Sequence, residues 1–214
     1  MRFLRCILVS MTDDSLPPGT LERLEKAEQL KLSGHNVEAL MILEELVLED
    51  PGNVAALEEI ADNELSLEHY PRAEVAASQA VALDASSYTG HYILGFLRSR
   101  EGKWGEALPR LKEANRLKAN NPEILRCLGW ALLRSDLKPQ GVVTLERSLN
   151  LDNDNPLTLC DLGVAYVEMR NFNKARALLL RTLDLDPHSQ RARECIAAID
   201  RLEKAMYEKP QHVQ

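Results

Sequence analysis

The chain repeats itself every 34 residues, and this repeat constrains its fold more than any other feature of the sequence. Shifting the sequence by 34 residues superimposes five segments without an insertion or deletion. A repeated segment of this length forms one supersecondary unit, and successive units bury their apolar faces against one another. We therefore predict that residues 20–189 form an array of five units: 20–53, 54–87, 88–121, 122–155 and 156–189.

Within each segment, apolar residues recur at the spacing of one amphipathic helix and then, after a short gap, of a second. Leu125, Leu128 and Leu132 of the fourth segment fall on one face of a helix with 3.6 residues per turn. The residue before each new segment has a side chain that can accept the free amides at a helix start: Asn53, Ser87, Asn121, Asn155 and Ser189. The sequence therefore predicts two antiparallel helices in every segment.

Small residues mark two positions of the segment where the paired helices are expected to touch. Position 8 is glycine in three segments, at Gly95, Gly129 and Gly163. A glycine inside a helix costs about 1 kcal/mol relative to alanine, so these glycines require a compensating close approach of a second helix. Position 20 is small in every segment: Ala39, Ala73, Ala107, Gly141 and Ala175.

These positions, together with the leucines that precede the three glycines, resemble the tetratricopeptide repeat, whose unit has the same length. The resemblance covers residues 20–189. It implies an all-α fold, a right-handed α-α superhelix of five helix-turn-helix repeats followed by a C-terminal capping helix. It also implies a protein-binding adaptor and not an enzyme. The chain departs from the family pattern at Glu64 and Arg98, where tyrosine is usual.

The stretch after the fifth segment has the pattern of one more amphipathic helix. Residues 190–208 place Ile196, Ile199 and Leu202 on one side. Repeat arrays require a terminal element with a polar outer face, because the last unit would otherwise expose its apolar flank. We predict a capping helix here, and residues 209–214 are expected to fray.

The stretch before the first segment, residues 1–19, lies outside the repeat. It combines Arg2 and Arg5 with an apolar run that is shorter than a normal secretory signal and lacks a small-residue cleavage site. We interpret it as a disordered extension. A true start at Met11, a targeting signal and a weak membrane anchor are the alternatives.

The composition argues against several classes of function. A net charge of −7 disfavours nucleic acid, which requires a basic surface, and no run of residues is long and apolar enough to span a membrane. The sequence has no phosphate-binding loop, no dinucleotide fingerprint and no HExxH motif, so no catalytic site, metal or cofactor is predicted. Four cysteines without a CxxC pair suit free thiols in a reducing compartment, which favours the cytoplasm: Cys6, Cys127, Cys160 and Cys195.

The family resemblance implies that positions 2, 5, 6, 9, 12 and 13 of each first helix line a concave groove that receives a peptide or helix of a partner. Reading these positions off the sequence divides the groove by charge. The first and second repeats are acidic, the third and fourth are aromatic and basic, and the fifth is mixed. The candidate partner-binding residues are Glu58, Glu59, Asp62, Tyr92, Ile93, Phe96, Arg100, Arg126, Trp130 and Arg134.

The charge count supports this division. Residues 20–87 contain 4 Lys and Arg against 15 Asp and Glu, giving −11, whereas residues 88–155 contain 11 against 8, giving +3. We expect apolar side chains of a partner segment to pack against Tyr92, Phe96 and Trp130, with its acidic groups at the arginines and its basic end at the acidic repeat. The alternative is a self-assembling scaffold in which the basic middle of one molecule meets the acidic repeats of another.

Overall fold

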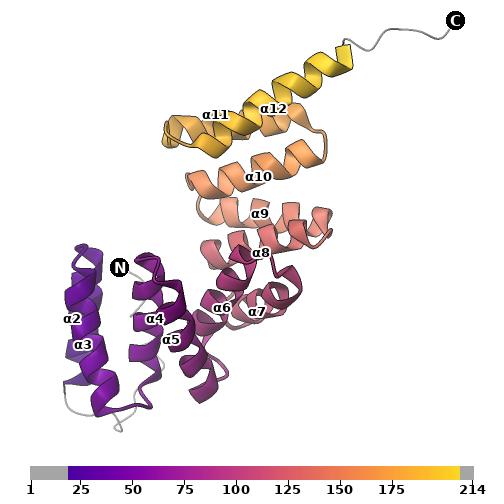
Figure 1. Cartoon of the computed structure of the whole chain (residues 1–214). Helices are drawn as coiled ribbons and strands as arrows, with labels where there is room; N and C mark the ends of the chain where they lie inside the picture. Colours follow the sequence, from indigo (N-terminus) through magenta and orange to yellow (C-terminus); the bar gives the residue numbers. More distant parts are fainter. Residues whose placement is uncertain (1–18, 208–214) are drawn as a thin grey trace, which may run out of the picture. The chain divides into compact units, whose positions relative to one another are not determined.

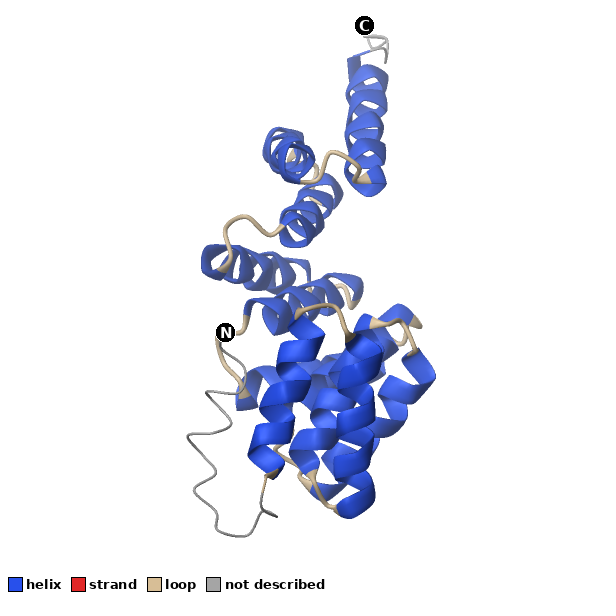
Figure 2. Ribbon diagram, turned by 90° about the vertical axis from the view of Figure 1, so that its left-hand side faces the viewer, coloured by secondary structure: helices blue, strands red, loops and turns tan. Residues whose placement is uncertain are grey.

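The computed structural model describes residues 19–207, and all regular structure within that range is helical (Figures 1 and 2). The predicted all-α fold class is confirmed. The eleven helices of the described range are α2 (Thr20–Leu32), α3 (Asn36–Glu49), α4 (Val54–Ser66), α5 (Tyr70–Leu83), α6 (Tyr88–Arg100), α7 (Trp104–Leu117), α8 (Pro122–Arg134), α9 (Lys138–Leu151), α10 (Pro156–Glu168), α11 (Phe172–Leu185) and α12 (Gln190–Tyr207). The N-terminal extension and the C-terminal tail that the sequence predicts lie outside the described residues, except for Gly19.

The chain divides into two compact units at the end of α6. Unit 1 comprises the described residues up to Leu97, and unit 2 those from Arg98 onward. In unit 1, α3 packs against α2 and α4, and α4 packs against α5. In unit 2, each helix from α7 to α12 packs against the next one in that part of the chain. Consecutive helix pairs thus stack in chain order within each unit, as in a helical solenoid.

Side-chain caps fix the starts of the first helices. The side-chain oxygens of Asn53, Asn121 and Asn155 each accept a hydrogen bond of 3.0 Å from the amide three residues later. Ser87 does the same through its hydroxyl oxygen, at 3.0 Å from the amide of Gly90. Each cap satisfies an amide that has no partner inside its helix, so the capping prediction is confirmed at these four positions.

Gly129 and Gly163, two of the glycines at position 8, lie where the paired helices come into close contact. A Cβ added to Gly129 would lie 2.8 Å from Cγ of Leu145 and 3.1 Å from the carbonyl oxygen of Gly141. A Cβ added to Gly163 would lie 2.8 Å from two side-chain carbons of Leu179. Because van der Waals contact between carbon atoms needs about 3.5–4.0 Å, the predicted close approach is confirmed at both sites.

The turn inside each pair contains one residue in the left-handed region, always at position 15. Two of these residues are glycines, and three are not. Their φ angles are 81° at Gly34, 61° at Glu68, 71° at Gly102, 65° at Asp136 and 57° at Arg170. The same backbone turn therefore forms with different side chains, although a left-handed conformation costs a residue with a Cβ about 1–2 kcal/mol.

The C-terminal helix closes unit 2. Ala192 and Ile199 of α12 are fully buried, and the helix packs against both α10 and α11. It continues as helix through the positions at which every preceding first helix turns back. The capping role predicted from the sequence therefore agrees with the position of α12.

Candidate partner-binding surfaces

The acidic positions of unit 1 are partly enclosed and not uniformly open to solvent. Glu58 on α4 is 8% exposed, and the hydroxyl of Ser87 donates a 2.5 Å hydrogen bond to its Oε1. Burial raises the pKa of the Glu58 carboxyl, although the bond from Ser87 opposes the shift. The carboxyl of Glu58 is therefore enclosed by the protein and is not an open position of the groove.

Lys31 on α2, the first helix of the preceding repeat, partly neutralises the charges of the other two acidic candidates, Glu59 and Asp62. Lys31 of α2 forms an ion pair with Asp62, and its Nζ lies 3.7 Å from Oε2 of Glu59. Burial raises the pKa of Glu59, and the charge of Lys31 acts in the opposite direction. Lys31 occupies position 12, one of the groove positions of the family, and the sequence analysis did not single it out.

The aromatic residues of α6 pack partly against the core of unit 1. The rings of Tyr92 and Phe96 are tilted by 42° with centroids 6.3 Å apart, a favourable aromatic geometry. Both side chains remain half-buried and rest on the core cluster. Ile93 is fully buried within that cluster, so its side chain is part of the core and does not face a partner.

In unit 2, two guanidinium groups lie close to the indole ring of Trp130 on α8. The guanidinium carbon of Arg134 lies 5.9 Å from the ring centroid, and that of Arg191 on α12 lies 4.5 Å away. A cation within about 6 Å of an indole face is attracted by the ring quadrupole. The indole is thereby held in one orientation with part of its surface still accessible.

A chain of charged groups links three helices beside this tryptophan. Asp161 of α10, whose side chain is 2% exposed, contacts Arg126 at 2.9 Å and Arg191 at 2.6 Å. Arg126 also donates two hydrogen bonds to the carboxylate of Glu123, 2.9 Å and 2.5 Å long. Such charge-assisted bonds are short and directional, so they fix α8, α10 and α12 relative to one another. We call Trp130, Arg134, Arg191, Asp161 and Arg126 the tryptophan platform.

The arginines of the platform differ in accessibility. The side chain of Arg126 is 14% exposed and bonded to the carboxylates of Glu123 and Asp161. That of Arg134 is 44% exposed and reaches Glu168 at 3.1 Å, and that of Arg191 is 43% exposed. Arg100, at the end of α6, is also exposed. Because a guanidinium carries five N–H donors, Arg134 and Arg191 keep donors for an incoming acceptor.

Arg191 is a platform residue that the sequence analysis missed. It was assigned only to a capping helix, yet it stacks on Trp130 and binds Asp161. Continuing the 34-residue register past residue 189 places Gln190 at position 1 and Arg191 at position 2, which is a groove position. The 34-residue register, continued into α12, therefore predicts a groove position for Arg191.

The described cysteines are free thiols of low reactivity. Cys127 and Cys160 are buried, and Cys195 is half-buried. Burial raises the pKa of Cys160 to about 11, and it raises the pKa of the Cys127 and Cys195 thiols as well. Within residues 19–207, no cluster of three or more His, Cys, Asp or Glu residues could hold a metal ion.

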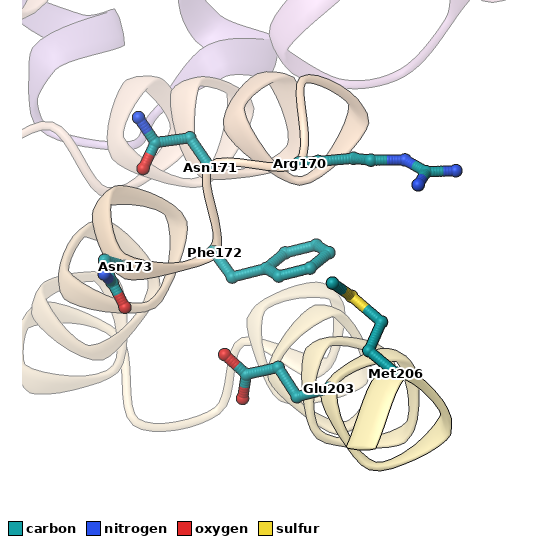
Figure 3. Close-up of a pocket in the computed structure, with 6 residues that line it drawn as sticks. All are labelled: Arg170, Asn171, Phe172, Asn173, Glu203 and Met206. Carbon is teal, nitrogen blue, oxygen red and sulfur yellow. The ribbon is translucent and has the colours of Figure 1, made fainter. Parts of the chain in front are cut away.

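One pocket lies at the end of unit 2, and none of its lining residues belongs to the platform. It has a volume of about 580 Å³ and is lined by residues of the turn between α10 and α11, of the start of α11 and of α12. Figure 3 shows the ring of Phe172 and the side chain of Met206 pointing toward each other, with Glu203 beside them. Phe172 occupies position 17, where Tyr70 and Trp104 stand in two earlier repeats, and its side chain also packs against the core cluster of unit 2.

Comparison with solved structures places this arrangement among known folds. A thermophilic TPR protein of Thermus thermophilus, TTC0263, is 23% identical, covers 83% of this chain and 97% of its own, and superimposes with a TM-score of 0.61. The chain has the tetratricopeptide-repeat fold. YrrB, described as a TPR protein with an unusual peptide-binding site, covers 91% of this chain and 97% of its own at 19% identity, with a TM-score of 0.61.

A curated relative also matches part of this chain by sequence. The mouse (Mus musculus) protein O-mannosyl-transferase TMTC1 is 26% identical over 140 residues, which are 64% of this chain. The chain spans 15% of the length of that relative. No protein-family model matches the sequence. Among the helices of the described residues, none combines the length and the apolarity that a membrane crossing requires.

Proposed function

We propose that this tetratricopeptide-repeat chain is a non-catalytic adaptor that binds a segment of another protein on the first-helix face of its repeats. The tryptophan platform of unit 2 is the principal contact, and Tyr92 and Phe96 form a separate apolar contact surface on unit 1. In this proposal Glu59 and Asp62 attract basic residues of the partner.

The observation that carries the proposal is the state of Trp130. Its indole is half-buried and contacts two guanidinium groups, which themselves form ion pairs with Asp161 and Glu168. An ordered aromatic side chain loses little conformational entropy on binding, and tryptophan and arginine are enriched among residues that dominate interface energies. The platform is therefore preorganised for binding before a partner arrives.

The charges of the platform define the partner chemistry. Arg134 and Arg191 have carboxylate partners but retain unused donors, so a partner carboxylate can join each pair without displacing it. An apolar residue of the partner would lie on the exposed part of the indole. We therefore expect a segment in which an apolar residue is flanked by aspartate or glutamate.

Affinity capture from the native source, followed by binding measurements with the purified partner, tests the proposal. Trp130→Ala should weaken binding at least tenfold, since it removes a central aromatic contact. Val143→Ala is a matched control, because Val143 is a 64% exposed apolar residue on α9. Circular dichroism must show that both variants keep their helicity.

Equal affinity of the Trp130→Ala variant and the wild type would remove the platform from the binding site. Loss of binding in the Val143→Ala variant alone would move the site to the second helices. Either result contradicts the proposal, because it requires the first-helix face.

Opposite charges on the two units favour a second candidate, a self-assembling scaffold. Residues 19–97 carry 4 Lys and Arg against 15 Asp and Glu, and residues 98–207 carry 19 against 15, giving −11 and +4. A head-to-tail contact joins two unlike surfaces of this kind. A molar mass that stays monomeric at high protein concentration and low salt would exclude it.

A further inference from the structure

Helix α3 carries an apolar stripe that no other second helix of the array has. Val37, Met41 and Leu48 are 68%, 59% and 84% exposed. At 100° per residue the three side chains fall within an arc of about 40° around the helix. Single exposed aliphatic residues are ordinary, but three at one angle of a helix can contact the same occupant, with Glu44 in the turn between Met41 and Leu48.

The register shows that the stripe is particular to the first repeat. The three residues occupy positions 18, 22 and 29, and no later second helix has large aliphatic residues at all three. The same positions hold Pro71, Val75 and Ala82 in α5, Gly105, Pro109 and Arg116 in α7, Pro139, Val143 and Asn150 in α9, and Asn173, Ala177 and Asp184 in α11. Packing of the repeat therefore does not require the stripe.

Carboxylates border the stripe on both sides. Glu44 lies next to it on one side of α3, and Glu38, Glu45 and Glu49 lie on the other. Arg72 pairs with Glu44, and Arg23 pairs with Glu45 and Glu49. Four carboxylates thus face two guanidinium groups, which leaves a local excess of negative charge. The stripe suits an occupant that is both apolar and basic.

The first ten residues of this chain have that chemistry. The segment MRFLRCILVS contains Arg2 and Arg5 and no acidic residue, and most of its other side chains are apolar. Unit 1, by contrast, has a net charge of −11. Opposite charges of this kind steer the encounter, and apolar contact then supplies affinity.

The point at which the chain enters α2 makes the stripe accessible to that segment. Arg23, in the first turn of α2, lies 2.6 Å from Glu49 and 3.2 Å from Glu45, so α2 begins beside the last turns of α3. Residues 10–18 can span about 30 Å when extended. That exceeds the length of α3, which at 14 residues is about 21 Å.

We propose that residues 1–10 bind in cis along the Val37–Met41–Leu48 stripe of α3, with Arg2 and Arg5 against its bordering glutamates. The tether raises the local concentration of the segment to the order of millimolar, so a weak contact suffices for occupancy. In this arrangement residues 1–10 contact the second-helix surface of the first repeat.

Paramagnetic relaxation in the full-length chain tests the proposal. A nitroxide is attached to Cys6 in a ¹⁵N-labelled Cys195→Ser variant, since Cys127 and Cys160 are buried thiols of raised pKa. Amide signals of Met41, Glu44 and Leu48 should lose most of their intensity. The residues at the same register positions of α9 should keep theirs: Val143, Glu146 and Asn150.

A pair of matched variants separates specific docking from loose proximity. Met41 and Val143 share position 22 and are 59% and 64% exposed, so lysine at either place leaves the core intact. Met41→Lys should restore the signals of Glu44 and Leu48, and Val143→Lys should not. High salt should act like Met41→Lys, because it screens the pairing of Arg2 and Arg5.

Two outcomes would overturn the proposal. The first is full signal intensity along α3, or a loss of intensity that Met41→Lys leaves unchanged. The second is signal loss in a mixture of unlabelled spin-carrying chains with ¹⁵N-labelled Cys6→Ser chains, which would assign the stripe to the N-terminus of a second copy.

Discussion

Replacing Gly141 with alanine will destabilise unit 2, although alanine occupies this position in the other four repeats. An alanine Cβ here would lie 2.7 Å from Cγ of Leu133, and 2.9 Å from both the carbonyl oxygen of Gly129 and the amide nitrogen of Leu133. Two of these three atoms belong to the backbone of α8. They can yield only if α8 and α9 move apart.

The magnitude follows from two opposing terms. Alanine gains about 1 kcal/mol over glycine in a helix interior. Forcing an extra carbon into a packed site costs typically about 1–3 kcal/mol, and contacts to backbone favour the upper part of that range. We therefore expect a net loss of about 1–2 kcal/mol. Gly105 of α7 is the matched control, because a Cβ there meets no atom within 4 Å, and Gly105→Ala should gain about 0.4–1 kcal/mol.

Urea unfolding followed by tryptophan fluorescence measures both effects. The protein has two tryptophans, Trp104 and Trp130, and both lie in unit 2. The fluorescence midpoint therefore reports on the unit that carries both substitutions, even if the array does not unfold in one step. If Gly141→Ala raised the midpoint as Gly105→Ala does, the close approach of α8 and α9 would not limit the size of the residue at position 20.

Three further predictions concern charge and backbone strain. Glu58→Gln should stabilise unit 1 at pH 7 and flatten its dependence on pH: burial raises the pKa of Glu58, so its contribution to stability is full at low pH and is lost as pH rises through that raised pKa. Asp161→Asn should lower the stability of unit 2 by about 2 kcal/mol, because it weakens charged hydrogen bonds to Arg126 and Arg191. Glu68→Gly should raise stability by about 0.5–1 kcal/mol, since Glu68 adopts φ of 61°.

Each of these variants has a direct check. Urea titrations at pH 5 and pH 7 test Glu58→Gln, and Glu22→Gln on the exposed side of α2 should leave the pH dependence as it is. A thermal scan tests Asp161→Asn. An unchanged melting midpoint would mean that the charge of Asp161 does not stabilise unit 2. Glu22→Gly inside α2 should lose stability where Glu68→Gly gains it.

The sequence predicted the helix pairs because their determinants are local or repeat at a fixed period. The caps at Asn53 and Asn121, and the small residues at positions 8 and 20, can each be read from a few neighbouring residues. Each of these local patterns is weak by itself, but its recurrence every 34 residues in five segments makes the prediction of helix pairs strong. No long-range contact had to be known in advance.

The accessibility of the first-helix face could not be read in the same way. Helical periodicity gives the direction of a side chain around its own axis, but it does not show what the neighbouring repeat places over it. At position 6, Ile93, Cys127 and Asp161 are all buried. Position 13 is exposed in all five repeats, and position 9, which holds Phe96 and Trp130, is half-buried in all five.

The ion pairs were equally hidden from the sequence, because their partners are about one repeat apart. Arg126 and Asp161 are 35 residues apart, and Arg134 and Glu168 are 34 apart. Arg126 and Arg134, which the sequence predicts as partner-binding residues, therefore already have carboxylate partners within the chain. A register-based search for opposite charges at the same or the next position of successive repeats would have found both pairs.

The ionic chain from Arg126 through Asp161 to Arg191 limits how far the repeats can be treated as interchangeable cassettes. A fourth repeat transplanted into another array would bring Trp130 but leave behind the arginine that stacks on it, since Arg191 comes from the terminal helix. Trimming the chain at residue 189 would have the same effect. Protein engineers who graft this surface must therefore move residues 122–207 as one block.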